Sequence, residues 1–332
     1  MNWKLILLTL GAFILIWVAF LVTGVSTVEG LQQMVKGSMG SARGWTGTLR
    51  EMTPLLLLGI AVFVGLRAGL FNIGADGQFN IGALCGVFVA LNYQGPGAII
   101  VALLAGCVGG ALWAWPAGLI KAHRGGHEVI TTIMLNNLAF FLTLALVKGP
   151  LKDPNAQSPT SANVADAAFL PYIFESGNIK ISLGWVFGIV AVIGLWTWLK
   201  KTVSGYELEA TGANPKAAET AGVKTKAVTV RAMLLSGMIA GFAGAIQVLA
   251  FEHRFYSGFS PGYGFDALGV ALLAGNSPIG LLPSSLLFSV ISKGVTSVSL
   301  LGVPKGMNGI LIGLVVIVFA AMRYRKAVKN DG

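Results

Sequence analysis

Apolar runs of about 20 residues recur along almost the whole chain, and this repetition constrains the fold more than any other feature. Each run can cross a bilayer as one helix, because a helix rises about 1.5 Å per residue and the hydrocarbon core is about 30 Å thick. Charged residues make up only 11% of the chain, whereas soluble domains carry roughly 25%. The sequence therefore predicts an all-α integral membrane protein. We expect ten spans, at residues 5–25, 53–70, 73–92, 98–120, 129–148, 181–199, 231–250, 264–275, 279–299 and 307–322.

Lysine and arginine predict how these spans are oriented. The first run, 5–25, exceeds the roughly 7–15 apolar residues of a signal peptide, so we interpret it as a span. Ten crossings place both termini on one side, and cytoplasmic connections carry the excess of basic residues. This rule predicts cytoplasmic termini and a cytoplasmic segment at 200–231. The segments 26–52 and 149–180 then become external, and the second is rich in Pro, Asn and Ser, as surface loops are.

Two segments interrupt the apolar pattern with glycines and polar residues. They are 69–82 and 262–278, and the apolar part of the second, 264–275, is too short to cross as a regular helix. Backbone of this kind is tolerated at membrane depth only where protein or a watery cavity satisfies its polar groups, so we expect both segments to approach a central pathway. They also hold matching positions in two oppositely oriented sets of spans, which is typical of transporters with inverted repeats. The alternative is that glycine-rich helices simply pack tightly.

Polar side chains at membrane depth are the candidate pathway residues, because burying them is costly. Asn72, Gln78 and Asn80 cluster in the sequence with Phe71 and Phe79. A sugar or a base needs hydrogen-bonding groups beside apolar faces, so this cluster fits a polar, weakly stacking substrate better than an ion. Asn136 and Asn137 are about 100° apart on a helix, so we expect one to face the pathway and the other to bond a neighbouring helix. For Asp76, at the end of its span, a helix-capping role is equally open. The complete candidate set is Phe71, Asn72, Asp76, Gln78, Asn80, Asn136, Asn137, Asp266 and Asn276.

The segment 200–231 carries its own helix signals. Asn214 is a typical N-cap, Pro215 suits the first helical position, and Gly222 suits the C-terminal end. These signals predict a short helix from about Pro215 to Ala221, which would form a docking surface on the membrane face. The alternative is a solvated loop that carries only orienting charge.

Three motifs together resemble one family of transporters. They are LRAGLFNIGADGQFNIGA at 66–83, GGHEVITTIMLNN at 125–137 and TGANPKAAETAGV at 211–223. In this order they resemble the permease subunits of bacterial ABC importers, a family that includes ribose and branched-chain amino-acid permeases. The resemblance extends over residues 53–322 and is strongest to the nucleoside-uptake branch.

The resemblance implies a type II importer-like permease, a single transmembrane permease domain over residues 1–332 in the bacterial cytoplasmic (inner) membrane. Its substrate would be a nucleoside, with ribose-like sugars or branched-chain amino acids as alternatives. The implied partners are a second permease subunit, commonly a paralogue, a cytoplasmic ATPase, and an extracytoplasmic substrate-binding protein or lipoprotein. The resemblance also implies that 200–231 docks on the ATPase, and within it we assign the coupling residues as Glu207, Gly212, Ala213, Asn214, Pro215, Ala217, Ala218 and Gly222.

Catalytic and metal-binding motifs are absent from the sequence. No Gly-x-x-x-x-Gly-Lys-Ser/Thr loop occurs, so we expect the partner ATPase to bind ATP and magnesium, and this chain not to be an enzyme. His123, His127 and His253 are not spaced as a ligand set, and the basic residues flank apolar spans, which argues against a nucleic-acid partner. An ATP-independent secondary transporter or channel remains the alternative of a different class.

Overall fold

Helices dominate the structure, as the apolar runs predict. The computed structural model describes residues 17, 20, 24–177, 179–304, 306, 309–314 and 317, so the predicted spans 5–25 and 307–322 lie for the most part outside the described residues. The helices are α2 (Thr27–Ser38), α3 (Ala42–Arg67), α4 (Ala75–Asn92), α5 (Ala98–Arg124), α6 (Glu128–Lys148), α7 (Leu183–Lys201), α8 (Val203–Ala213), α9 (Pro215–Thr220), α10 (Thr225–Gln247), α11 (Tyr263–Ala274) and α12 (Leu281–Val298). The eight predicted spans between 53 and 299 all overlap one of these helices.

Six helical stretches within the described residues are long and apolar enough to cross a membrane. They are Ala42–Arg67, Ala98–Arg124, Glu128–Lys148, Leu183–Lys201, Thr225–Glu252 and Pro278–Leu301. The helix α4 falls outside this set because polar side chains occupy its first turns, and α11 has only 12 residues. These two helices, α4 and α11, begin within the two glycine-rich segments that the sequence pattern singles out.

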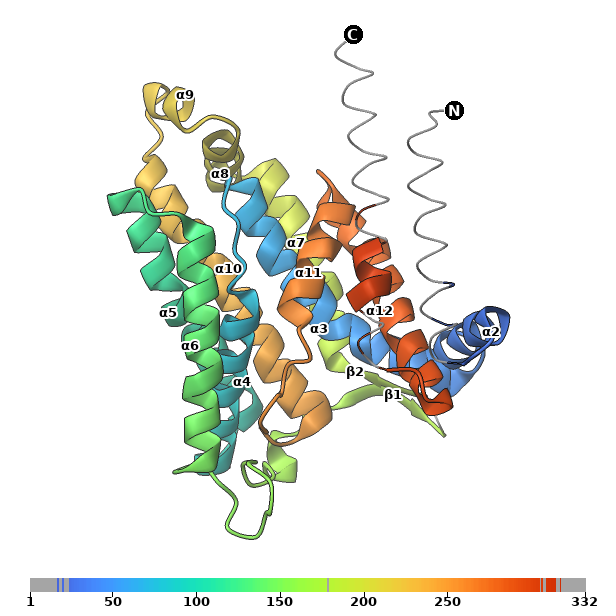
Figure 1. The fold of residues 1–332 in the computed structure, drawn as a ribbon. Helices are drawn as coiled ribbons and strands as arrows, with labels where there is room; N and C mark the ends of the chain where they lie inside the picture. The colour runs from blue at the N-terminus through green and yellow to red at the C-terminus, as the bar shows by residue number, and fades with distance from the viewer. Residues whose placement is uncertain are drawn as a thin grey trace, which may run out of the picture.

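The connections gather at two ends of the bundle (Figure 1). The helices α8 and α9 lie at one end, and the antiparallel hairpin of β1 (Tyr172–Ser176) and β2 (Ile179–Ser182) lies with α2 at the other. We call these the α8–α9 end and the hairpin end. The segments 26–52 and 149–180 share the hairpin end, so the structure keeps them apart from the segment 200–231, as their predicted positions on opposite membrane faces require.

Two predicted boundaries are wrong. The second span begins at Ala42 rather than at 53, so residues 42–52 are helix and not part of a connecting segment. Charged residues lower the hydropathy of this extension, so a hydropathy pattern does not predict it as part of the span. The fold accommodates the charge because Arg50 pairs with Glu252 at 2.7 Å. The segment 200–231 is also shorter than predicted, because α10 already begins at Thr225.

Glycines bring α4, α5 and α10 into close contact. A Cβ atom on Gly110 would meet the carbonyl oxygen of Gly237, and one on Gly241 would meet that of Gly106. A Cβ on Gly82 would in turn meet the backbone of Gly241. Small residues allow such approach between membrane helices. Tight packing through glycines therefore occurs between α4, α5 and α10, in addition to the glycine-rich interruptions before α4 and α11.

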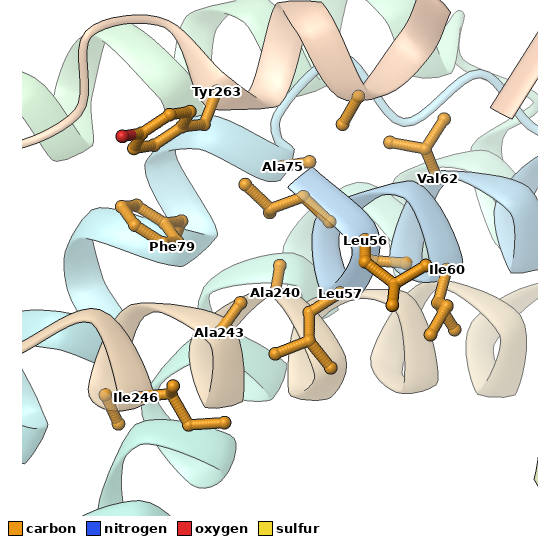
Figure 2. Close-up of a cluster of buried hydrophobic side chains, with 14 of the residues drawn as sticks. Leu56, Leu57, Ile60, Val62, Ala75, Phe79, Ala240, Ala243, Ile246 and Tyr263 are labelled. Atoms are coloured by element: carbon orange, nitrogen blue, oxygen red, sulfur yellow. The ribbon is translucent and has the colours of Figure 1, made fainter. Parts of the chain in front are cut away.

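The apolar core lies where α3, α4, α10 and α11 meet. Figure 2 shows Leu57 of α3 beside Ala240 of α10, and Leu56 packs towards Gly188 of α7. The ring of Phe79 on α4 lies 6.0 Å from that of Tyr263 on α11, edge to face. This core holds the first turns of α4 and α11 beside each other, and the candidate site is built on that junction.

Candidate functional site

The two interrupted segments meet at the first turns of α4 and α11. Asp76 Oδ1 on α4 accepts hydrogen bonds from the Gly264 backbone N–H at 2.9 Å and from Ser260 Oγ at 2.6 Å. A side chain on Gly264 would overlap the Asp76 backbone. The capping role left open for Asp76 is therefore real, but the helix that receives the carboxylate is α11, not its own. A carboxylate between two helix N-termini is also favoured by both helix dipoles.

A cavity of about 160 Å³ opens beside this junction. Its walls come from α4, from α6 and from the segment 255–260 that leads into α11. Four of the predicted pathway residues, Asp76, Asn80, Asn136 and Asn137, lie together in its lining. The other lining residues are Phe140, Thr143, Leu144, Phe255, Ser257, Gly258, Phe259 and Ser260.

Both adjacent asparagines of α6 line this cavity. The side chain of Asn137 bonds its own helix, at the Ile133 carbonyl oxygen (3.1 Å), rather than a neighbouring one. Asn136 Oδ1 is buried and accepts no hydrogen bond from the described residues. The lining residues of α6, from Asn136 to Leu144, recur at helical spacing and form one face of that helix, and the Asn136 amide oxygen beside them has spare acceptor capacity.

Asn72 and Gln78 do not line the cavity. The Asn72 side chain donates to Gln78 Oε1 and to Ser236 Oγ, both at 2.8 Å, and its oxygen accepts from Gln78 Nε2 at 3.2 Å and from the Gly74 N–H at 3.1 Å. Ser236 donates in turn to the Ala61 carbonyl oxygen. This closed cluster, which we call the Asn72 cluster, joins α3, α4 and α10, and its geometry supports a structural role for Asn72 and Gln78.

The remaining predicted pathway residues do not line the cavity either. Phe71 is 41% exposed, Asp266 is half-buried on α11, and Asn276 is exposed in the turn that follows α11. Their positions follow from the direction of the chain, because α11 runs from the middle of the bundle towards the α8–α9 end (Figure 1).

Sequence reasoning missed the residues that hold the hairpin end of the site. The Glu51 carboxylate on α3 accepts a hydrogen bond from the Tyr263 hydroxyl at 2.9 Å, which ties α3 to the start of α11. Arg50, besides its pair with Glu252, lies over the Phe251 ring at 5.2 Å. The sequence could have drawn attention to these residues only as charged residues next to an apolar run. It could not show what they bind, because their partners lie about two hundred residues away in the sequence.

The segment 149–180 is more than a surface loop, because part of it supports the cavity wall. Backbone N–H groups of Ser161, Val164 and Leu170 donate to carbonyl oxygens of Phe255, His253 and Leu249, each at 2.8 Å. The Phe255 N–H bonds Ser161 Oγ in return. These bonds fix the direction in which residues 255–260 enter the bundle.

His253 marks the bend at which this segment leaves α10. Its φ of 55° lies in the left-handed region, and its ring stacks on Phe169 with centroids 3.7 Å apart. Burial, and secondarily the nearby Arg50 guanidinium, lower the pKa of His253 below its ordinary value. The neutral imidazole is therefore the form that fits the folded structure.

The predicted short helix in the segment 200–231 is confirmed. The Asn214 side chain accepts a hydrogen bond from the Ala217 N–H at 3.1 Å, Pro215 begins α9, and Gly222 has a φ of 88°. The preceding helix α8 was not predicted. It packs on the end of α3, because Glu209 pairs with Arg67 and a Cβ on Gly212 would meet the Arg67 carbonyl oxygen.

The predicted coupling residues divide into two groups. Ala213, Asn214, Pro215, Ala217 and Gly222 are exposed and form the outer surface of α9 and its ends. Ala218 is only 5% exposed, and Glu207 and Gly212 are half-buried. Inward-facing residues position the segment, so only the exposed group offers a surface to a partner.

Comparisons with known proteins agree with this architecture. The sequence profile of the family described as branched-chain amino acid transport system / permease component matches residues 45–320. The glucose ABC transporter permease protein TsgB13 of Haloferax volcanii is 34% identical over 98% of this chain and 90% of its own length. The guanosine ABC transporter permease protein NupP of Bacillus subtilis is 34% identical over 92% of this chain and 88% of its own. The nucleoside ABC transporter permease protein NupB of Lactococcus lactis is 32% identical over 94% and 88%. The chain is a multi-pass membrane protein that belongs to this family of ABC transporter permeases.

Proposed function

We propose that this chain is the permease subunit of an ATP-driven importer and that the cavity lies on the pathway of a nucleoside. The observation that carries the proposal is the lining itself, in which amides and the Asp76 carboxylate stand beside phenylalanine rings. A nucleoside presents a flat base and ribose hydroxyl groups. Amides can bond the edge of a base, the carboxylate can accept from hydroxyl groups, and the rings supply apolar contact.

The relatives support this substrate class without deciding it alone. NupP and NupB are named for guanosine and for nucleosides, whereas TsgB13 is named for glucose. A sugar importer is therefore the second candidate. Branched-chain amino acids fit the lining less well, because among the described residues it contains no lysine or arginine to pair with the substrate carboxylate.

The proposal requires partners at both ends of the bundle. A separate ATPase would bind ATP and magnesium and dock on α9. A second permease subunit, expected to be a paralogue, would complete the pathway. An extracytoplasmic protein would deliver substrate at the hairpin end. This arrangement makes the α8–α9 end cytoplasmic. Basic residues gathered there support that orientation; they include Lys200, Lys201, Lys216, Lys224 and Lys226.

Uptake of labelled guanosine by cells that express the whole transporter tests the substrate. Asn80→Leu and Asn136→Leu should each lower uptake at least tenfold while the complex still assembles. Asn92→Leu is the matched control, because Asn92 is on α4 outside the cavity and bonds only its own helix. No uptake of labelled guanosine, together with uptake of labelled glucose that both variants lower, would make the chain a sugar permease. Uptake that continues without ATP would exclude an ABC importer.

Thiol labelling tests the orientation. With Cys85 and Cys107 changed to alanine, a cysteine placed at the exposed Ser158 should react with an impermeant reagent from outside the cell. A cysteine at the exposed Thr220 of α9 should react only after the membrane is opened. The reverse pattern would invert the proposed topology.

A further inference from the structure

A groove separate from the cavity opens at the α8–α9 end, between the last turns of α5 and the first turns of α10. It encloses about 580 Å³. Its apolar lining comes from Leu119, Ala227 and Val230, and three cationic side chains, Lys224, Lys226 and Arg231, stand along it.

The positive charge of this groove is not neutralised by the protein. None of its lysine or arginine side chains pairs with an acidic side chain of the described residues, where the four ion pairs involve other cations. The groove contains the acid Glu219, but this carboxylate accepts a hydrogen bond from Thr225 at 2.7 Å. The groove therefore presents net positive charge to whatever enters it.

Apolar surface continues from the groove towards the middle of the membrane. Towards the middle of α5, Trp115 and Leu112 are 44% and 58% exposed, and they lie on the same helix face as Leu119. On α10, Met238 is 39% exposed and follows Arg231, seven residues earlier, on the same helix face. Both helices are long enough to span a bilayer. The basic groove is thus continuous with an apolar surface of α5 and α10 that can contact lipid acyl chains.

We propose that this groove binds an anionic phospholipid. The head-group phosphate lies among Lys224, Lys226 and Arg231, where the planar guanidinium can donate two parallel hydrogen bonds, and the acyl chains lie along Trp115 and Met238. A free phosphate would use the cations but not the apolar surface. A soluble protein that docks at the α8–α9 end would leave that surface uncovered.

The bound lipid would also steady the docking helix. Glu219 on α9 and Thr225 on α10 already bond across the short connection between the two helices, and Lys224 lies within that connection. A head group held by Lys224 and Arg231 therefore restrains α9 from the membrane side. The proposal requires only that this end of the bundle lies at a membrane interface, so it stands independently of which substrate is carried.

The test compares the full chain in nanodiscs of phosphatidylcholine with nanodiscs that also contain phosphatidylglycerol. The anionic lipid should raise the unfolding temperature of the wild type and remain bound in native mass spectra. Each cation near the surface contributes about a fivefold gain in affinity for anionic lipid, so K224Q/K226Q/R231Q should bind roughly a hundredfold more weakly and show no shift. The matched control K200Q/K201Q removes exposed cations at the same end but outside the groove and should keep the shift.

Three results would overturn the proposal. A triple variant that retains the full lipid shift would show that the groove is not the site. A shift that inorganic phosphate reproduces in phosphatidylcholine alone would identify a free anion as the ligand. A triple variant that keeps the lipid shift but no longer binds the ATPase would assign the cations to the protein partner. If the triple variant fails to insert, the single variant R231Q gives the same comparison, with an expected loss of about fivefold.

Discussion

Asn72→Leu separates a structural role from a pathway role for the polar residues at membrane depth. Four hydrogen bonds of the Asn72 cluster involve the Asn72 side chain, and all four disappear in this variant. At about 0.6 kcal/mol for each side-chain hydrogen bond measured between membrane helices, the loss is about 2 kcal/mol of unfolding free energy. The Gln78 amide and the Gly74 N–H are left buried without their partner, which makes this figure a lower bound.

The assay is unfolding of the purified full chain by denaturant in micelles, combined with uptake per assembled complex. Gln78→Leu in the Asn72→Leu background should cost less than the sum of the two single changes, because removing both partners leaves fewer buried polar groups unsatisfied. Asn80→Leu should behave oppositely. Its amide bonds only the Asp76 carbonyl on its own helix, so stability should change little while uptake falls.

Two results would contradict the structural role of Asn72. If Asn72→Leu unfolds as the wild type does and yet abolishes uptake, Asn72 lies on the pathway, and the interpretation of the Asn72 cluster as a structural joint is wrong. If Asn80→Leu destabilises the chain as strongly as Asn72→Leu, the cavity lining is not separate from that cluster.

Further predictions follow from packing, docking and titration. Gly241→Leu should lower the unfolding free energy by roughly 3 kcal/mol because its side chain would overlap the α5 backbone, whereas Gly194→Leu on α7, with open space around it, should be neutral in the same unfolding experiment. Ala217→Trp on the exposed face of α9 should weaken co-purification of the ATPase with folding intact, while Ala218→Trp should first destabilise α9 itself. Because the pKa of His253 is lowered in the folded state, the unfolded chain binds more protons; stability should therefore fall as the pH drops below about 6.5, and H253N should flatten this dependence in thermal unfolding.

Much of the fold was predictable because its signals are local. Apolar runs locate the membrane helices, and Asn214 and Pro215 locate α9, since an N-cap and the residue that follows it act within one turn. The start of α3 was not predictable in this way. Arg50 and Glu51 lower the hydropathy of the helix, and the partners that stabilise them there, Glu252 and Tyr263, belong to a distant part of the chain.

The sequence predicts which types of residue form the candidate site, but not which of them lie together in the folded protein. Asn72 and Asn80 look alike in the sequence, as asparagines in one glycine-rich segment. What separates them is the non-helical backbone before Ala75, which turns Asn72 towards Ser236 of α10, while Asn80 lies on α4 beside the cavity. Phe259 and Ser260 carry no signal at all, because their position depends on long-range backbone bonds to residues 161–170.

The segment 200–231 and the cavity are connected by a short series of contacts between packed elements. The helix α8 is held on the end of α3 by the pair of Glu209 with Arg67 and by the close approach of Gly212. The chain then passes through the Asn72 cluster into α4, where Asp76 bonds the first turn of α11. The Asn72 cluster contributes no surface to the cavity, but it joins α3, α4 and α10 between the α8–α9 end and the cavity wall, so its role is structural in this series of contacts.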